Sequence, residues 1–509
     1  MKSLQLNQFV SVLKSNDLWL EGELLGEASI VISDTRKLKT ISGDQKVLFF
    51  ARKGVTFDGH EFLQDIDAFP AVVGIVGERI PHGIRLTKPF VRVRSSSQAM
   101  ALAVKFFWAD PSSQMFLAAV TGTNGKTTST FLMQSLLKTL GFRPARFGTI
   151  ETEFEGNAVP SELTTPDFEE LQKILHDFQS KGANAAVFEA SSHALDQGRL
   201  LGLEVDAAIF TNLTPEHLDY HRTMENYYLA KKRLFSELLR VSSKKKKIAV
   251  IPDDGSFGSR LIEDLRGLDH VEVLVWTCDV AKKSRSDLFL KAVQTSLSGT
   301  EIDVEDCKTQ AQLSFRSFLT GHYNAENMMG MIGLGWALKA DPSKIQSSLD
   351  QMPPVSGRLE RVDHKGDGFV FVDYAHTPDA LENVLSTLRG LTKGKLRVVF
   401  GCGGDRDRGK RPKMGEVAEL YADEMFVTSD NPRTEDPEGI IREILQGMQR
   451  LKPCRVNSDR RQSIELALKD MGPQDVLLIA GKGHEKYQII GSQKYPFDDR
   501  EVVQQFSAL

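Results

Sequence analysis

The pattern of apolar and polar residues divides the chain into three blocks. The first block runs to about residue 112 and contains short apolar runs of β type, such as Val47–Phe50 and Val72–Val76. It ends in the turn-rich stretch Trp108–Ser113, before a new apolar run begins. We therefore expect a first domain over residues 1–112.

The second block opens with the continuous apolar run Phe116–Val120, which is typical of a strand buried on both faces of a parallel sheet. Similar runs follow at Ala185–Phe188 and Ala207–Phe210, and helical patterns such as Ser129–Leu140 lie between them. Alternating strands and helices predict a doubly wound α/β domain over residues 113–352.

The third block follows Pro353–Pro354, which we interpret as a linker. Four more apolar runs are separated by helical patterns: Phe369–Val372, Arg397–Phe400, Glu424–Val427 and Val476–Ala480. They predict a second α/β domain, Rossmann-like, over residues 353–509. The chain is thus expected to be an α/β protein with two parallel sheets behind an N-terminal domain.

Composition excludes several classes of protein. The chain has 509 residues, of which 41% are apolar and 26% charged, as in globular proteins with several cores. Its 64 basic and 68 acidic residues give a net charge of −4, so we expect no nucleic-acid partner. No apolar stretch reaches the roughly 18 residues that span a bilayer, and Met1–Leu20 lacks a signal-peptide core. The four cysteines form no Cys-x-x-Cys pair, so we expect a cytoplasmic protein with reduced thiols and no membrane insertion.

A glycine-rich loop lies between the run Phe116–Val120 and the next helical pattern. Its residues are Gly122, Thr123, Asn124, Gly125, Lys126, Thr127 and Thr128. Two glycines let backbone N–H groups approach phosphate oxygens, and the helix N-terminus adds partial positive charge. Lys126 is expected to reach the β- and γ-phosphates, and the Thr127 hydroxyl to bind Mg²⁺. An ordinary glycine turn is the alternative, but Lys-Thr-Thr between a strand and a helix favours nucleotide binding. Kinases, ATPases and ligases all remain open.

The stretch Thr121–Thr128 resembles the ATP loop of the Mur ligases and the related folylpolyglutamate synthases, which lack a glycine where this chain has Val120. Further segments resemble diaminopimelate-adding members of the Mur ligase family. They are Leu163–Pro166, Glu189–Arg199, Phe210–Leu213, His217–His221, Asp373–Pro378, Gly401–Asp407, Asp430–Arg433 and Ala480–Glu485. These segments occur in the family's order and extend over all three blocks.

The resemblance implies a three-domain architecture for the UDP end of a substrate, for ATP and for an incoming amino acid. It implies that ATP phosphorylates the D-glutamyl γ-carboxylate of UDP-N-acetylmuramoyl-L-alanyl-D-glutamate, and that the amine of meso-diaminopimelate then displaces phosphate. The reaction would be a cytoplasmic step of peptidoglycan precursor synthesis. The partners would be small molecules, and we expect a monomer.

The resemblance also assigns residues to the nucleotide site. It implies that Lys126, Glu189, His217 and Lys231 are catalytic, with Lys231 as an N6-carboxylated side chain. Thr127, Glu189, His217 and the Lys231 carbamate would bind Mg²⁺, since a carbamate offers oxygen ligands where an ammonium would repel the ion. Further nucleotide contacts would come from Asn324, Asn327, Arg358 and Asp373.

Two more sets of residues would hold the other substrates. The muramoyl-dipeptide would be bound by Thr35, Thr164, Thr165, Ser191, Gln197 and Arg199. Diaminopimelate would be bound by Arg406, Asp430, Asn431, Pro432, Arg433, Gly481 and Glu485. Arginine suits the extra carboxylate of diaminopimelate because its planar donors bind a carboxylate through two parallel hydrogen bonds.

Four other functions are alternatives. An L-lysine-adding ligase is the nearest, although such relatives usually lack the arginine at 433. A folylpolyglutamate synthase is disfavoured by a whole block before the phosphate loop. A phosphate-loop ATPase or kinase module would leave Arg406, Arg433 and the segment Glu189–Arg199 without explanation. A binding protein that retains the fold without catalysis is disfavoured by the intact set of Lys126, Glu189, His217 and Lys231.

Overall fold

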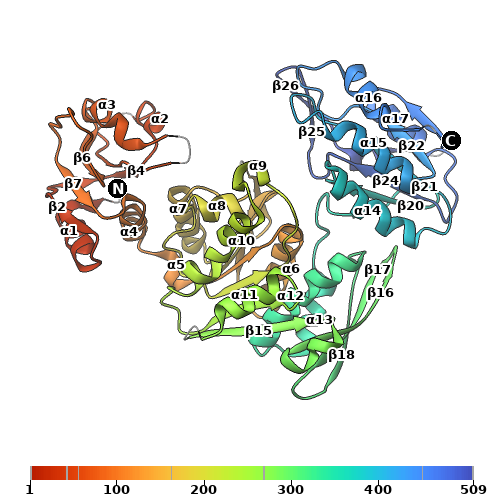
Figure 1. The fold of residues 1–509 in the computed structure, drawn as a ribbon, viewed down its shortest axis with the longest axis horizontal. Helices are drawn as coiled ribbons and strands as arrows, with labels where there is room; N and C mark the ends of the chain where they lie inside the picture. Colours follow the sequence, from red (N-terminus) through yellow and green to blue (C-terminus); the bar gives the residue numbers. More distant parts are fainter. Residues whose placement is uncertain are drawn as a thin grey trace. The chain divides into compact units, whose positions relative to one another are not determined.

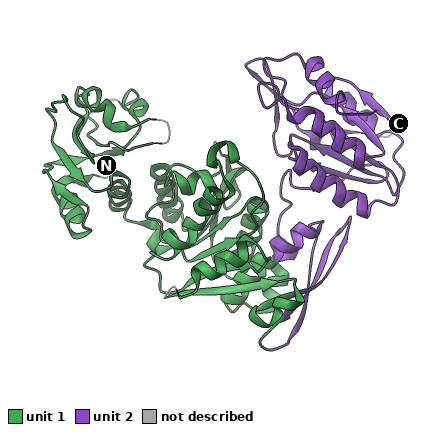
Figure 2. Cartoon of the chain, in the orientation of Figure 1, with its two compact units in different colours: residues 1–289, 306–309, 329–348 green, residues 290–305, 310–328, 349–509 purple. Residues whose placement is uncertain are grey.

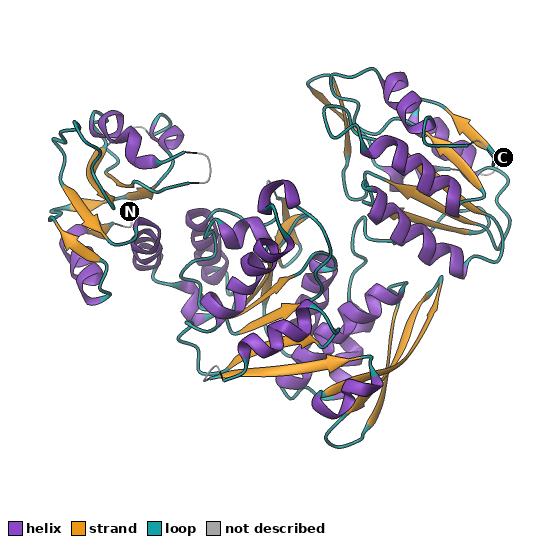
Figure 3. Cartoon of the chain, viewed as in Figure 1, coloured by secondary structure: helices purple, strands orange, loops and turns teal. Residues whose placement is uncertain are grey.

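The computed structural model describes residues 3–41, 44–54, 57–161, 163–267, 270–449 and 451–506. The chain forms two compact units (Figure 2). The first unit comprises residues 1–289, 306–309 and 329–348, and the second comprises 290–305, 310–328 and 349–509. Figure 3 shows strands and helices mixed in both units, which confirms the predicted α/β class. The domain boundaries at 112/113 and 352/353 stay predictions.

The N-terminal part of the first unit is a five-stranded sheet. Its strand order is β2 (Trp19–Glu21), β7 (Phe90–Val93), β6 (Val72–Gly77), β5 (Val47–Phe50) and β4 (Ile30–Ile32). Strands β4 to β7 are parallel, and only β2 is antiparallel to its neighbour. The predicted apolar runs form β5 and β6.

Helices and a short strand pair complete this part. They are α1 (Leu6–Ser15), α2 (Thr35–Leu38), the 3₁₀ turn η1 (Gly59–Phe62), α3 (Leu63–Asp67), α4 (Ser96–Trp108), β1 (Leu4–Gln5) and β3 (Glu27–Ala28). Helix α1 buries Leu6, Phe9, Val10 and Leu13, which recur at helical spacing. These side chains share one core with residues of α4 and of β5 to β7.

The first unit also contains the larger sheet around the phosphate loop (Figure 1). Its strands run in the order β11 (Asn157–Pro160), β10 (Glu151–Phe154), β9 (Pro144–Phe147), β12 (Ala185–Glu189), β8 (Phe116–Thr121), β13 (Ala207–Phe210), β14 (Lys247–Pro252) and β15 (Val271–Thr277). The strands from β9 to β15 in this order are parallel. Strands β12, β13 and β14 are buried at every position, as expected of a sheet covered on both faces.

Helices follow these strands as the sequence predicts. They are α5 (Pro111–Gln114), α6 (Lys126–Thr139), α7 (Phe168–Ser180), α8 (Ser192–Asp196), α9 (Leu218–His221), α10 (Met224–Arg233), the π-helical turn η2 (Leu234–Leu239), α11 (Phe257–Leu265), the 3₁₀ turn η3 (Val280–Arg285) and α13 (Pro342–Gln351). Helix α6 begins three residues before the predicted start, because the last residues of the phosphate loop already form the first turn of the helix.

The second unit combines a parallel sheet with antiparallel strands. The parallel sheet has the order β19 (Glu360–Val362), β20 (Phe369–Asp373), β24 (Val476–Ala480), β21 (Leu396–Phe400), β22 (Glu424–Val427) and β23 (Cys454–Val456), with only β19 antiparallel. The four predicted apolar runs form β20, β21, β22 and β24. The sequence analysis did not predict β16 (Leu288–Ser296), β17 (Gly299–Asp306) and β18 (Gln312–Ser317), which follow β15 in the strand order of the larger sheet. Strands β15 and β16 are parallel, and β17 and β18 are antiparallel.

Two apolar clusters cover the two faces of that parallel sheet. One contains side chains of α14 (Pro378–Leu391), α15 (Lys410–Tyr421) and α16 (Pro437–Leu445). The other contains side chains of α17 (Arg460–Leu468) and α18 (Asp499–Gln505). The hairpin of β25 (Tyr487–Ile490) and β26 (Gln493–Pro496) and the helix α12 (His322–Ala337) complete the secondary structure.

The topology places the candidate residues at strand ends. In the first unit, Gly122 follows β8, Glu189 ends β12 and Thr211 follows β13, and these three strands are neighbours. In the second unit, Asp373 ends β20 and Gly481 follows β24. Carboxyl ends of parallel strands are where α/β sheets bind ligands. Among the residues that the structure describes, no helix is long and apolar enough to cross a membrane.

Candidate active site

The phosphate loop needs glycine at two positions for different reasons. Gly122 has φ +152°, and a Cβ atom there would lie 1.8 Å from Thr211 Oγ1. Gly125 has φ +87° and caps the N-terminus of α6, in the left-handed region that glycine adopts without strain. The loop therefore passes close to the chain after β13 and then turns directly into a helix, as a phosphate-binding loop must.

The segment after β13 fixes the loop through several hydrogen bonds. Thr123 N–H donates to the Asn212 carbonyl at 2.9 Å, and Asn124 N–H donates to Asn212 Oδ1 at 2.9 Å. Thr211 Oγ1 donates to the Asn124 carbonyl at 2.7 Å. Sequence reasoning did not single out Asn212 as a site residue, although the segment Phe210–Leu213 carried part of the resemblance.

Two lysine ammonium groups share one carbonyl oxygen of the loop. Lys126 Nζ donates to Gly122 O at 3.0 Å and to Thr123 O at 2.7 Å. Lys231 Nζ, on α10, donates to the same Gly122 O at 2.6 Å and lies 4.4 Å from the centre of the Tyr227 ring. Lys231 is only 1% exposed, and burial, followed by the Lys126 charge, holds its pKa well below the usual lysine value.

Glu189 is buried at the end of β12, and Thr149 holds its carboxylate. Thr149 N–H donates to Glu189 Oε1 at 2.8 Å, and the Thr149 hydroxyl donates to Oε2 at 3.0 Å. Gly148 leaves room for this carboxylate, since a Cβ atom there would lie 2.4 Å from Oε1. The sequence analysis did not identify Thr149.

His217 precedes α9 with φ +55°, an unusual backbone conformation for a residue other than glycine. Its ring centre lies 4.9 Å from that of His193, and its Nε2 lies 3.7 Å from a Glu216 oxygen. Burial lowers the pKa of His217, the Glu216 carboxylate opposes this, and the charges of Lys126 and Lys231 add to the lowering. The ring is therefore best suited to act in its neutral form.

Two of the residues predicted to bind Mg²⁺ offer it oxygen ligands. Thr127 and Glu189 offer oxygen atoms, which Mg²⁺ prefers, and Mg²⁺ commonly takes its other ligands from phosphates and water. Lys231 as a free amine is not an oxygen ligand. The described part of the chain contains no group of three or more His, Cys, Asp or Glu side chains that could hold a metal ion by themselves.

The residues predicted to hold the muramoyl-dipeptide are connected by hydrogen bonds, except Thr35. Arg199 donates to the Thr165 carbonyl at 3.2 Å and to Gln197 Oε1 at 2.6 Å. Thr165 Oγ1 donates to the Glu189 carbonyl at 2.7 Å and lies 3.3 Å from Ser191 Oγ. Thr164 Oγ1 lies 3.2 Å from Thr149 Oγ1. This network therefore adjoins the Glu189 carboxylate, while Thr35 lies on α2 of the N-terminal part.

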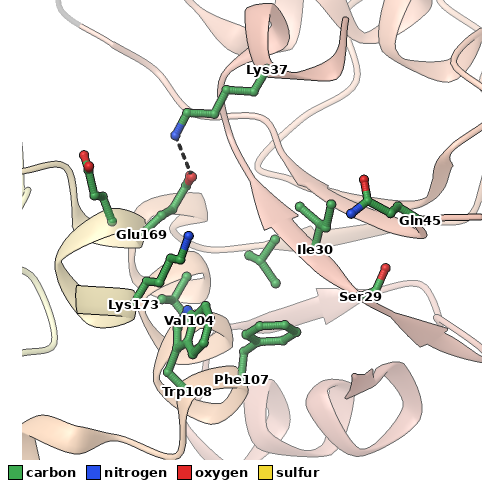
Figure 4. A pocket seen from close by; sticks show the side chains of 11 residues that line it. Ser29, Ile30, Lys37, Gln45, Val104, Phe107, Trp108, Glu169 and Lys173 are labelled. Carbon is green, nitrogen blue, oxygen red and sulfur yellow. Dashed lines mark hydrogen bonds and ion pairs between the residues drawn. The ribbon is translucent and has the colours of Figure 1, made fainter. Parts of the chain in front are cut away.

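A cavity of about 620 Å³ lies in the first unit between β4, α2, α4 and α7 (Figure 4). Lys37 Nζ bonds Glu169 Oε2 at 3.2 Å at its rim, and Phe107 and Trp108 contribute aromatic surface. Glu169 also accepts a hydrogen bond from Ser33 N–H at 3.1 Å, and burial raises its pKa. No residue of this cavity was predicted as a site residue.

In the second unit, the loops after β21, β22 and β24 bring the predicted diaminopimelate residues together. Arg433 has φ +51°, and its guanidinium donates to the Gly404 carbonyl at 2.8 Å. A Cβ atom on Gly403 would lie 2.9 Å from that guanidinium and 3.9 Å from Arg406. Both arginines thus lie beside the same glycine turn.

Of the two acidic residues in this set, Asp430 lies beside Gly481 and Glu485 bonds Asn431. Gly481 has φ +113°, and a Cβ atom there would lie 2.6 Å from Asp430 Oδ2. Asn431 Nδ2 donates to Glu485 Oε2 at 2.8 Å, and the Pro432 carbonyl lies against Gly404. The structure therefore brings all seven predicted residues into one group of loops that carries both charge signs.

The predicted nucleotide contacts of the second unit are buried or partly buried. Asp373 accepts hydrogen bonds from Leu359 N–H at 2.6 Å and Ala375 N–H at 2.8 Å, and burial raises its pKa. Arg358 lies 5.3 Å from the centre of the Tyr374 ring. On α12, Asn327 Nδ2 donates to Asn324 Oδ1 at 3.1 Å, and both asparagines are buried.

Comparisons with known proteins agree with this arrangement. Residues 120–335 match the Mur ligase middle domain, and residues 357–483 match the Mur ligase glutamate ligase domain. The chain is 40% identical over 501 residues to the UDP-N-acetylmuramoyl-L-alanyl-D-glutamate–2,6-diaminopimelate ligase of Geobacter metallireducens, covering 95% of this chain and 94% of that protein. It is 39% identical to the ligase of the same name from Bacillus velezensis, with 90% of each chain covered.

Solved structures give the same result. A UDP-N-acetylmuramoyl-L-alanyl-D-glutamate–2,6-diaminopimelate ligase structure matches with a TM-score of 0.69 and 32% identity, covering 94% of both chains. MurF from Acinetobacter baumannii, at 17% identity and a TM-score of 0.58 over 96% of both chains, shares the fold. These matches confirm the three-domain Mur ligase architecture. The chain belongs to the Mur ligase family, within the group of the 2,6-diaminopimelate ligases.

Proposed function

We propose that this chain uses ATP to join meso-2,6-diaminopimelate to the D-glutamyl γ-carboxylate of UDP-N-acetylmuramoyl-L-alanyl-D-glutamate. The observation that carries this proposal is the group of loops that holds Arg406 and Arg433 beside Asp430 and Glu485. The far end of diaminopimelate carries both an ammonium and a carboxylate. Lysine carries only an ammonium there and would leave the arginines unpaired, which is costly in a partly buried site.

The phosphate loop accounts for ATP binding. The loop N–H groups, the N-terminus of α6 and the Lys126 ammonium together offer positive charge to the phosphates. Lys126 donates to Gly122 O and Thr123 O, and phosphate oxygens would replace these carbonyls as its acceptors. Thr127 and Glu189 would hold Mg²⁺, which neutralises phosphate charge when it is bound.

Lys231 is proposed to act as its N6-carboxylated form. Its amine is buried, lies next to a second cation and has a lowered pKa, and all three properties favour the neutral nucleophile that reacts with CO₂. The product would replace a positive charge with a negative one beside Lys126, which turns repulsion into attraction. A carbamate there would add oxygen ligands to the set of Thr127, Glu189 and His217.

Residues of the dipeptide network are proposed to present the carboxylate that reacts. Arg199 and Gln197 lie in one hydrogen-bonded chain with Thr165, which itself bonds the Glu189 main chain. A γ-carboxylate oxygen held there would attack the γ-phosphorus, and ADP would leave. The diaminopimelate amine would then attack the acyl carbon, form the amide bond and release phosphate. Asn324, Asn327, Arg358 and Asp373 are proposed to contact the nucleotide.

We further propose that the reaction is a cytoplasmic step of peptidoglycan precursor synthesis and that the enzyme acts as a monomer. All residues assigned above come from one chain, and the relatives that cover at least nine tenths of it are named for this activity. The domain boundaries at 112/113 and 352/353 are kept as part of the proposal.

Phosphate release tests the proposed reaction. The protein is incubated with ATP, Mg²⁺ and UDP-N-acetylmuramoyl-L-alanyl-D-glutamate, and one amino acid is added at a time. We expect release with meso-diaminopimelate and little with L-lysine or L-glutamate. Release that is faster with lysine would contradict the specificity, and release without any amino acid or muramoyl substrate would indicate a phosphate-loop ATPase instead.

A further inference from the structure

Lys482 is a fully buried lysine in the loop after β24 that none of the roles above uses. We infer that Lys482 is a positioning residue, which fixes Glu485 so that the Oε1 atom of Glu485 receives the ammonium group of the incoming amino acid. The inference rests on the proposed function, since it assigns an atom within the proposed diaminopimelate site.

The Lys482 ammonium has three donors and finds three acceptors. Nζ lies 3.1 Å from Glu485 Oε2, 3.3 Å from Asn431 Oδ1 and 2.5 Å from the Tyr487 carbonyl oxygen. A lysine with no exposed side-chain surface is rare unless its charge is paired, because burial removes its hydration. All of its donors are therefore committed within the protein, so Lys482 is not itself a ligand contact.

Asn431 has its side-chain amide fixed in one orientation. Its Oδ1 accepts from Lys482 Nζ and from Ile489 N–H at 2.8 Å, and its Nδ2 donates to Glu485 Oε2 at 2.8 Å. The opposite amide orientation would place NH₂ hydrogens against an ammonium and a backbone N–H. Asn431 is 4% exposed, so it supports Glu485 from behind and presents little surface to a ligand.

The two oxygens of the Glu485 carboxylate consequently differ. Oε2 accepts from both Lys482 and Asn431, whereas Oε1 accepts no hydrogen bond from the residues that the structure describes. The two oxygens of Asp430, which lies beside Gly481, differ in the same way. Its Oδ1 accepts Asn431 N–H at 2.7 Å, and its Oδ2 accepts none within the same described ranges. One free oxygen of each carboxylate thus remains for the donors of an ammonium group.

Charge balance gives Lys482 a second effect. Asp430 and Glu485 place two negative charges around Asn431, and Lys482 is the cation that pairs directly with Glu485. The buried Arg460, which pairs with Asp499, also attracts both carboxylates, and the ammonium of the ligand adds a further positive charge. Replacing Lys482 with a neutral residue leaves Glu485 without its ionic partner, so the carboxylate is free to turn toward another donor and lose the orientation that the ligand requires.

The test compares Lys482→Met with Lys486→Met, which changes an exposed lysine of the same loop. We expect Lys482→Met to raise the KM for meso-diaminopimelate by about 10- to 100-fold, the usual effect of losing a charged hydrogen bond that orients a ligand contact. The KM values for ATP and the muramoyl substrate should stay within about 2-fold, as should all three for Lys486→Met. An equal rise in the KM for ATP, or no rise for diaminopimelate, would overturn the inference.

A double-mutant cycle separates positioning from general damage to the loop. If Lys482 acts through Glu485, then Lys482→Met should add less than about 3-fold to the KM already raised by Glu485→Gln. Effects that multiply fully would contradict the inference. Should Lys482→Met not be recovered folded, Lys482→Gln in the same cycle keeps one donor and gives the same distinction. Wild-type phosphate release with diaminopimelate is measured first, because its absence rejects the proposed function rather than the role of Lys482.

Discussion

Lys126 and Lys231 both donate to the Gly122 carbonyl, and the distance between them gives the size of their charge repulsion. Because Lys231 Nζ lies 2.6 Å from that oxygen and Lys126 Nζ lies 3.0 Å from it, the two nitrogens are no more than about 5.6 Å apart. At an effective dielectric constant of about 20, two unit charges at that distance repel by roughly 3 kcal/mol. This repulsion disappears when Lys231 is neutral and changes sign when it carries a carbamate.

Removal of Lys231 should therefore affect turnover far more than folding. We expect Lys231→Ala to lower kcat for phosphate release by about 100-fold or more, as for the loss of a group that stabilises transition-state charge. Formate or acetate should restore part of the rate by supplying a carboxylate, whereas Lys231→Arg should not respond to either. Lys232→Ala is the matched control on the same helix, since Lys232 pairs with Asp264 at 3.0 Å. Wild-type turnover in Lys231→Ala would refute the carbamate.

Stability against pH tests the same lysine in the absence of substrates. The folded-state pKa of Lys231 is below its unfolded value of 10.5, so the unfolded chain binds more protons between these two values. The free energy of unfolding should therefore rise as pH increases through this interval in CO₂-free buffer. Lys231→Met should flatten this slope in urea titrations, and an unchanged slope would show that the amine is not the group responsible.

Three further predictions concern other parts of the two sites. Arg433→Ala should raise the KM for diaminopimelate by about 10- to 100-fold in phosphate-release assays while the KM for ATP stays unchanged; equal effects would count against direct recognition. Gly122→Ala should lower the free energy of unfolding by about 1–3 kcal/mol more than Gly141→Ala in urea titrations, because only the first substitution places a Cβ atom against another group. Equal losses of stability would show that the loop can shift to accommodate the Cβ atom. Arg411 holds the pKa of Glu435 at about 2, below the usual 4.5, so the stability that this pair contributes is present above pH 4.5 and is lost as pH falls toward 2. The protection factor of the Asp405 amide, which donates to Glu435 Oε1 at 2.6 Å, should fall over that range, and protection that stays unchanged down to pH 2 would contradict the assignment.

Sequence patterns predicted the parts of the fold that depend on local order. Buried parallel strands such as β8 and β12 read as continuous apolar runs, and the phosphate loop carries its own spacing. Strands β16 to β18 were missed because their alternating polar residues resemble loop composition. A lysine run such as Lys244–Lys247 is typical of a solvated loop, but Lys247 is buried at the start of β14 and donates to the Arg240 carbonyl at 2.8 Å. Charge alone does not reveal such main-chain acceptors.

The supporting residues of the sites could not be predicted because their partners lie far away in the sequence. Thr149 meets Glu189 across 40 positions, and Lys482 meets Asn431 across 51. No sequence pattern around Thr149 or Lys482 indicates such a distant contact. The resemblance named the residues that would touch substrates, whereas the fold shows which residues hold them in place.

The most direct test of the proposed function is a competition between the two amines. The protein is supplied with ATP, Mg²⁺, UDP-N-acetylmuramoyl-L-alanyl-D-glutamate and equal concentrations of meso-diaminopimelate and L-lysine, and the UDP-linked products are measured by mass spectrometry. We expect the diaminopimelate adduct to exceed the lysine adduct by about 100-fold or more, since lysine offers no carboxylate to the half-buried Arg433 and to Arg406. A product mixture dominated by the lysine adduct would contradict the account.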